Sequence, residues 1–189
     1  MRKKLAIFAS GAGSNAQKII DHFKESDKAR IALILCNKPN AGVLAIAERE
    51  GIETVLTDKE QYKKDGYASF LKEKGIDFVI LAGFLLKIPQ PLIDAYPQKI
   101  INIHPALLPK YGGKGMYGSF VHEAVVNNKE KESGITIHYV DEHYDHGAVI
   151  FQATCEVSAD DTPDTLAQKI HKLEHTHFPI IIEKIITDL

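Results

Sequence analysis

Short, continuous apolar runs alternate with amphipathic stretches through the first hundred residues, and this alternation constrains the fold more than any other feature. Strands are expected at 5–9, 31–36, 54–56, 78–82 and 100–103, and helices at 15–24, 42–50, 61–74 and 91–96. Strands that are apolar throughout and separated by helices are typical of a parallel sheet covered on both faces. The expected fold class is therefore α/β, with a doubly wound, mostly parallel sheet.

The pattern changes after residue 103. A loop with Gly and Pro (104–118) leads to a short helix (119–127), and two further strands (135–140 and 149–157) flank a loop rich in Asp, His and Gly. A long helix is expected from Pro163 to about residue 187, with its inner side formed by Leu166, Ile170, Leu173, Ile181 and Ile185. Because composition does not shift along the chain, we expect a single domain (1–189) with two lobes, 1–100 and 101–189.

Composition excludes several classes of function. The 189 residues carry a formal net charge of -2, so there is no overall positive field to attract nucleic acid or an anionic membrane. No apolar run approaches the roughly 20 residues of a membrane-spanning helix. Cys36 and Cys155 lie far apart within apolar segments, as expected for reduced thiols in a cytoplasmic protein.

The first chemically distinctive segment is Ser10-Gly11-Ala12-Gly13-Ser14-Asn15, between the first strand and the first helix. Glycines there permit a tight turn, and free amides at the helix start can bind an anion. The third glycine of a dinucleotide fingerprint would fall at Ala16, and the Gly-Lys-Ser/Thr ending of a triphosphate loop is missing. A monophosphate site fits better, and a capped glycine turn without a ligand is the alternative.

The second segment, Asn102-Ile103-His104-Pro105, stands at the carboxyl end of the fifth strand. Residues two apart in a strand face the same way, and ligands of open α/β sheets bind outside these strand ends. An amide and an imidazole side by side can stabilise an oxyanion and transfer a proton. The alternative is a locally satisfied strand end.

The third segment is the loop Asp141-Glu142-His143-Tyr144-Asp145-His146-Gly147, with three acids and two histidines in six positions. A solvated hairpin accounts for such a loop as readily as a functional site does.

Together these segments resemble the glycinamide ribonucleotide formyltransferase family. The resemblance rests on S-G-x-G-S-N, L-A-G-F, N-I-H-P-x-L-L-P-K-Y and the late D-x-G, and it covers the chain from Ala6 to about Ile181. It implies a Rossmann-like formyltransferase fold and two substrates, 10-formyltetrahydrofolate and 5-phosphoribosylglycinamide, with no metal, nucleic acid or membrane. Two related enzymes would usually carry a further domain that is not expected in this sequence. In a methionyl-tRNA formyltransferase it binds nucleic acid, and in the formyltetrahydrofolate deformylase it is an amino-terminal regulatory domain.

The resemblance also implies residue roles. Asn102 would bind the formyl oxygen, His104 would be the general acid, and Asp145 would keep His104 protonated. The ribonucleotide would contact Gly13, Ser14, Asn15, Lys64, Gly83, Pro105 and Glu174. The folate would contact Leu85, Leu86, Lys87, Ile88, Asn102, Val140, Asp141 and Glu142. Lys64 and Leu86 stand where the family usually has arginine.

Three alternatives remain at this stage. The deformylase would use water in place of the amine, but the phosphate-type loop and Glu174 favour a phosphoribosyl substrate. A catalytically silent folate- or nucleotide-binding protein would have no need of Asn102, His104 and Asp145 together. His171, His175 and His177 include an i, i+4 pair that could bind a metal, but no thiolate or carboxylate cluster supports a closed site there.

Overall fold

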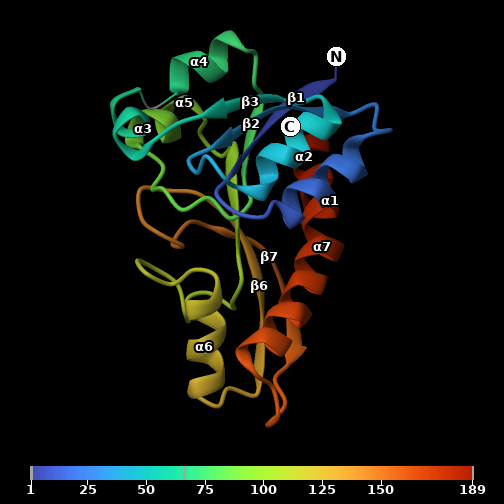
Figure 1. The fold of residues 1–189 in the computed structure, drawn as a ribbon, viewed down its shortest axis with the longest axis vertical. Helices are drawn as coiled ribbons and strands as arrows, with labels where there is room; N and C mark the ends of the chain where they lie inside the picture. The colour runs from blue at the N-terminus through green and yellow to red at the C-terminus, as the bar shows by residue number, and fades with distance from the viewer. Residues whose placement is uncertain (1, 66, 189) are drawn as a thin grey trace.

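The computed structural model describes residues 2–65 and 67–188, which form one seven-stranded sheet with helices around it (Figure 1). The strands are β1 Lys3–Ala9, β2 Ala29–Cys36, β3 Glu53–Leu56, β4 Phe78–Leu81, β5 Ile100–His104, β6 Glu132–Tyr139 and β7 Val149–Glu156. Their order in the sheet is β3-β2-β1-β4-β5-β6-β7. The pairs among β1–β5 are parallel, and β6 and β7 add antiparallel. The predicted doubly wound, mostly parallel fold is confirmed.

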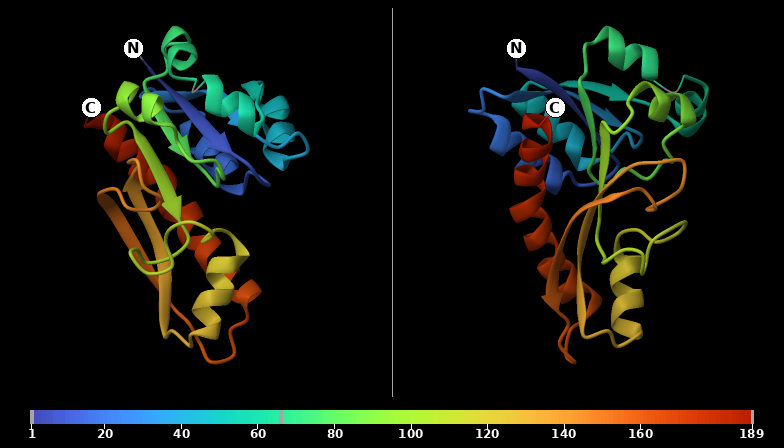
Figure 2. Two further views of the ribbon diagram at one scale, coloured as in Figure 1. Left: turned by 90° about the vertical axis from the view of Figure 1, so that its left-hand side faces the viewer. Right: turned by 180° about the vertical axis from the view of Figure 1, so that it is seen from behind.

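Helices cover the sheet on both sides. They are α1 Ser14–Phe23, α2 Gly42–Glu50, α3 Lys59–Asp65, α4 Ala68–Glu73, α5 Gln90–Ala95, α6 Ser119–Asn127 and α7 Pro163–Thr187. One apolar cluster joins the sheet to α1, α2 and α7, and a second joins its other face to α3, α4 and α5. Two further views show β6 and β7 extending away from the other strands, with α6 and α7 beside them (Figure 2).

The single helix predicted at 61–74 is wrong, because α3 and α4 are separate helices. Tyr67, between them, has a φ of 56° in the left-handed region, which interrupts right-handed helical geometry. Its ring is buried and stacks on Tyr62, with ring centroids 6.0 Å apart. Packing of these aromatic side chains accompanies the break, and the Asp65-Gly66 dipeptide is the turn signal for it in the sequence.

The long helix α7 begins as predicted at Pro163, after a capping box formed by Thr162 and Thr165. Its buried stripe recurs every four residues, and one member of the stripe is charged: Leu166, Ile170, Glu174, Phe178, Ile182 and Ile186. Leu173 and Ile181, predicted on the inner side, flank this stripe and are half-buried. From the sequence, Glu174 is expected at the site but not on the inner side of the helix, because that stripe was defined by apolar residues alone.

The two cysteines are free thiols: Cys36 is buried and Cys155 half-buried. Within residues 2–65 and 67–188, the helices include none that combines the length and apolar character needed to cross a bilayer.

Candidate active site

A cavity of about 590 Å³ opens at the carboxyl ends of β1, β4 and β5, where the strand order of the sheet reverses. In open α/β sheets this position is the usual ligand site, because the loops after neighbouring strands diverge there. The lining residues come from those three strand ends, from α6 and the loop before it, from the loop after β6 and from α7. They are Ser10 to Asn15, Ala82 to Leu85, Asn102 to Pro105, Gly113 to Gly118, His122, Tyr144, Asp145, His171 and Glu174.

The first wall of the cavity is the glycine loop between β1 and α1. Gly13 caps α1 with a φ of 85°, and a Cβ there would lie 2.9 Å from the backbone of Val43 in α2. Gly13 is therefore required by the packing of two helices as well as by the turn. A Cβ on Gly11 would meet nothing within 4 Å, so this position is open toward a ligand.

The side chain of Ser10 connects this loop with the loop after β4. Its Oγ accepts a hydrogen bond from Leu85 N (2.9 Å), and its own backbone N–H donates to Gly83 O (3.0 Å). The Ser10 hydroxyl also donates to Asn37 Oδ1. These contacts fix Gly83 and Leu85 against the glycine loop, so both loops present one continuous wall to the cavity.

Glu174 faces the start of α1 from the middle of α7. Its carboxylate accepts a hydrogen bond from Asn15 Nδ2 (2.9 Å), and the side chain is buried. Burial raises the pKa of the Glu174 carboxyl, while the Asn15 hydrogen bond and the nearby His171 lower it, and the net result is a raised pKa. Asn15 Oδ1 is buried and has no hydrogen-bond partner among the described residues. This end of the cavity therefore offers unused acceptors to a ligand.

Asn102 and His104 lie side by side on β5, as their spacing predicts. β6 pairs antiparallel with β5, which sets His138 opposite Asn102 and Thr136 opposite His104. His138 Nδ1 donates to Tyr139 O (2.8 Å), so its Nε2 can accept from Asn102 Nδ2 at 3.0 Å. The second hydrogen of that amide meets only a long contact of 3.4 Å to Asp145 Oδ1. One amide hydrogen is thus anchored, and the other is available to a substrate oxygen.

His104 is buried and sits between a carbonyl and a carboxylate. Its Nε2 donates to Tyr111 O at 2.7 Å, while its Nδ1 lies 3.6 Å from Asp145 Oδ2. Asp145 Oδ2 also accepts from Gly113 N at 2.9 Å. Asp145 has a φ of 55°, an uncommon backbone conformation that Asp tolerates better than most residues. The late loop therefore carries Asp145 into the cavity beside both β5 residues.

Charge and burial compete at these two groups. Burial works to raise the pKa of Asp145, but contacts with His138, His104 and Gly113 outweigh it, so the pKa of this carboxyl lies below its ordinary value. For His104, burial is the largest effect and lowers the pKa. The Asp145 charge and the hydrogen bond to the Tyr111 carbonyl raise it by less, so the pKa lies below its ordinary value. Whether Asp145 keeps His104 protonated stays a prediction: the carboxylate, 3.6 Å from Nδ1, works to raise the pKa of His104 against the larger effect of burial.

Comparison with known proteins identifies the family of the chain. The formyl transferase family matches residues 3–182. The chain belongs to the formyl transferase family. It is 38% identical to phosphoribosylglycinamide formyltransferase of Bacillus subtilis, covering 97% of this chain and 95% of that protein. It is 42% identical to the enzyme named phosphoribosylglycinamide formyltransferase, chloroplastic, of Arabidopsis thaliana, and it spans 62% of that protein's length.

Solved structures of the family superpose closely. Phosphoribosylglycinamide formyltransferase from Bacillus halodurans has a TM-score of 0.88 and 37% identity, covering 97% of this chain and 95% of that one. Glycinamide ribonucleotide transformylase 1 from Geobacillus kaustophilus has a TM-score of 0.89 and 35% identity, covering 98% and 100%. The family resemblance found in the sequence is confirmed.

In this family member, most of the predicted site residues meet at one cavity. The following line it: Gly13, Ser14, Asn15, Gly83, Leu85, Asn102, His104, Pro105, Asp145 and Glu174. The following do not line it in the described structure: Lys64, Leu86, Lys87, Ile88, Val140, Asp141 and Glu142. Lys64 is exposed on α3, whereas Ile88 is buried in the second apolar cluster with Leu86 and Val140 against it.

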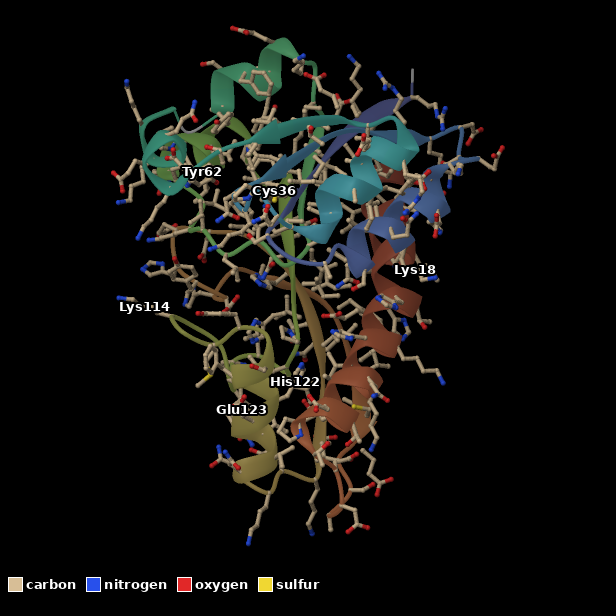
Figure 3. All side chains as sticks on the ribbon, viewed as in Figure 1. Lys18, Cys36, Tyr62, Lys114, His122 and Glu123 are labelled. Atoms are coloured by element: carbon tan, nitrogen blue, oxygen red, sulfur yellow. The ribbon has the colours of Figure 1, made fainter. Side chains whose placement is uncertain are left out.

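Several residues at the site escaped the sequence analysis. His138 contacts Asn102 directly, and its signal is the alternation of Thr136 and His138 with Ile135 and Ile137 along β6. His122, on α6, is buried at the cavity and has no partner for its Nδ1 among the described residues. Figure 3 shows His122 near the centre of the molecule and Lys114 extending outward from the loop before α6. Tyr117 and Tyr144, both partly exposed, also line the cavity.

Proposed function

We propose that this family member transfers the formyl group of 10-formyltetrahydrofolate to the amine of 5-phosphoribosylglycinamide, a step of de novo purine biosynthesis. The observation that carries the proposal is a single cavity with two chemically different ends. One end holds Asn102, His104 and Asp145, and the other holds the glycine loop with Glu174. The names of the relatives support the same reaction.

Asn102 is the oxyanion partner in this proposal. When the amine nitrogen attacks the formyl carbon, the carbonyl π bond breaks and negative charge develops on the oxygen. The free Nδ2 hydrogen of Asn102 donates to that oxygen, while His138 holds the other hydrogen and so fixes the plane of the amide. Loss of one such donor typically costs about a hundredfold to a thousandfold in turnover.

His104 acts as a proton relay rather than as a standing acid. Tyr111 O accepts the hydrogen on His104 Nε2, so in the neutral ring the lone pair is on Nδ1, 3.6 Å from Asp145 Oδ2, and burial favours that neutral form by lowering the pKa. The attacking amine gains positive charge as the new C–N bond forms, and His104 Nδ1 accepts its surplus proton. Asp145 stabilises the resulting imidazolium. The oxyanion then re-forms the carbonyl, the old C–N bond breaks, and the imidazolium protonates N10 of the folate. No proton or electron pair is left over.

The other end of the cavity suits the ribonucleotide. Amides of the loop from Gly11 to Ser14 at the start of α1 can bind the phosphate, because a helix amino terminus favours an anion. Glu174 and Asn15 present buried acceptors to the ribose hydroxyls or to the amine. The lobe 1–100 thus binds the phosphate, and the lobe 101–189 carries the reacting groups.

The folate is expected between Leu85 on one loop and Tyr144 on the other. Both side chains line the cavity and are about half exposed, so their apolar surface can cover a flat ring. The family resemblance also assigns Leu86 to Ile88 and Val140 to Glu142 to the folate, although these residues do not line the cavity. Of these, Lys87 lies near the slot, with its Nζ 6.0 Å from the Tyr144 ring centroid.

A formyl-transfer assay tests the proposal. Purified protein should consume 10-formyltetrahydrofolate only when 5-phosphoribosylglycinamide is present, and formylated ribonucleotide should accumulate in equal amount. Rapid turnover of the folate without the amine would favour the deformylase. Binding of both ligands without any product would favour the silent binding protein. We also infer a cytoplasmic location, which the free thiols Cys36 and Cys155 support.

A further inference from the structure

The loop between β6 and β7 carries three metal-ligating side chains outside the cavity: Asp141, His143 and His146. One ligand atom of each lies within 4.8 Å of the other two, and His146 Nδ1 is 3.0 Å from Asp141 Oδ2. We propose that these three side chains bind a divalent transition-metal ion of the zinc type, at a site separate from the reaction centre.

The ligand types and their spacing fit such an ion. Imidazole nitrogens and a carboxylate oxygen are common zinc ligands, and around a tetrahedral ion they lie about 3.3 Å from one another. The separation of His146 and Asp141 is already close to that value, and rotation of two exposed imidazoles can close the remaining gap. Glu142 Oε1, 3.7 Å from His143 Nδ1, offers a fourth ligand. Magnesium fits poorly, because it prefers oxygen ligands alone.

Packing does not explain the two imidazoles. The side chains of His143 and His146 are 66% and 74% exposed, so neither contributes much to a core. Their side-chain ion pairs are with the neighbouring acids Glu142 and Asp141. Those acids also give the group of ligand atoms a negative charge that attracts a cation.

The backbone of the loop holds these ligands in a fixed arrangement. A Cβ on Gly147 would lie 1.9 Å from Tyr139 O, so the two arms of the loop approach each other too closely for any other residue. Asp141 Oδ1 accepts from His143 N at 2.8 Å, which orients the carboxylate before an ion arrives. The site is thus partly preorganised, and little chain entropy is lost on binding.

The position of the site has a consequence for Asp145. None of the three proposed ligands lines the cavity, whereas Asp145, in the same loop, does. An ion bound by Asp141, His143 and His146 would cross-link the chain on both sides of Asp145. Metal binding should therefore restrict opening of residues 141–147 and hold Asp145 against Gly113.

The competing place for a metal is α7. His171 and His175 stack with ring centroids 6.1 Å apart, but His175 Nε2 is buried. Among the described residues, the ligand atoms of Asp141, His143 and His146 lie close enough together to hold an ion, and those of His171 and His175 do not belong to such a set of three. The experiment must therefore distinguish binding at residues 141–146 from binding at the His171–His175 pair.

Binding is measured on full-length protein without a histidine tag and without either substrate, so the result is independent of the proposed function. Calorimetric titration with Zn²⁺ should give one ion per chain, and Co²⁺ should give the absorption of a tetrahedral nitrogen and oxygen site. His143→Asn with His146→Asn should weaken Zn²⁺ binding by more than about tenfold, since even outer partners of metal ligands are worth that much. His177→Gln, on α7, is the matched control and should bind as wild type does.

A second readout is amide hydrogen exchange in residues 141–147, which Zn²⁺ should slow in wild type and not in the double variant. The loop side chains are exposed, so the double variant should keep the wild-type fold, which circular dichroism can verify. Absence of Zn²⁺ binding in wild type, or unchanged affinity in the double variant, would overturn the proposal. Loss of binding in His171→Asn instead would assign the metal to α7.

Discussion

At the scale of single residues, the site depends on the balance between desolvation and charge at His104. The imidazole is buried, and its closest carboxylate contact, at 3.6 Å, is too long to compensate fully. A neutral histidine beside an ionised Asp145 can accept a proton that it could not accept if it were already charged. The carboxylate then stabilises the charged histidine only when the reaction delivers a proton.

The first prediction concerns Asp145→Asn. Turnover should fall by about a hundredfold to ten-thousandfold, the usual range for loss of acid-base assistance, while ribonucleotide affinity changes little. The amide keeps the shape of the side chain but cannot stabilise the imidazolium. Steady-state kinetics at neutral pH, with separate binding measurements for both ligands, provide the comparison.

The pKa of His104 supplies an independent readout for the same variant. NMR titration of the wild type should place it below 6.5, because burial dominates. Since Asp145 raises this pKa, the Asn variant should show a lower value still. Near wild-type turnover in the variant, or a His104 pKa that rises, would remove Asp145 from the proposed relay.

A second prediction compares two glycines of the same loop. Gly13→Ala should destabilise the fold by about 1–3 kcal/mol, because its Cβ would collide with Val43 and Ile46 and the residue has a positive φ. Gly11→Ala should leave stability unchanged, since its Cβ meets nothing in the free protein. It should nevertheless raise the KM for the ribonucleotide more than the KM for the folate. Urea unfolding and kinetics on both variants give the result.

Equal weakening of both substrates by Gly11→Ala would argue against a phosphate site in this loop. Unchanged kinetics would argue against it as well. In either case the ribonucleotide phosphate would have to bind elsewhere in the cavity.

At the scale of elements, the antiparallel register of β5 and β6 builds the reaction centre. Asn102 on β5 faces His138 on β6 across the ladder. β6 contributes no group to the proposed reaction, but through His138 it positions Asn102. Slipping the register by one residue would turn His138 to the opposite face of the sheet. His138 is therefore a positioning residue in the proposed mechanism.

The third prediction tests that role with two substitutions. His138→Leu removes the acceptor for Asn102 Nδ2, so the amide loses its orientation. Turnover should fall by up to about a hundredfold. His138→Gln can offer an amide oxygen in place of Nε2 and should recover a large part of that loss. Equal activity in the two variants would mean that His138 has only a packing role. KM for the ribonucleotide should stay near wild type in both.

The elements themselves were largely predictable, because β1, β2 and β4 contain continuous apolar runs and most helices are amphipathic. The break at Tyr67 was not predicted, although the sequence has a turn signal there, Asp65-Gly66. At the site, the spacing of Asn102 and His104 and the family motifs predicted the residues near the reaction. His138 and His122 escaped because each lies on an element of ordinary pattern, and only the fold brings them to the cavity.

At the scale of the whole molecule, the cavity lies between parts of the chain that are far apart in sequence. Asn15 on α1 bonds Glu174 on α7, while His122 on α6 is buried near His104 on β5. Unfolding must expose these buried polar groups together. The pH dependence of stability therefore reports on the assembled site.

The last prediction uses His122, whose pKa is lowered to about 4 by burial, with smaller contributions from His171 and His104. An unfolded chain protonates this histidine near pH 6.5, so between about pH 6.5 and 4 the unfolded state binds more protons than the folded one. Stability should fall as the pH is lowered through this window, by about 3 kcal/mol from this group at pH 4, and only slightly more below it. Urea unfolding of wild type and His122→Gln at several pH values isolates the contribution, because the other titrating groups cancel in the difference between the two proteins. The variant should lose less stability than wild type on acidification, and parallel curves would show that His122 titrates alike in the folded and unfolded chains.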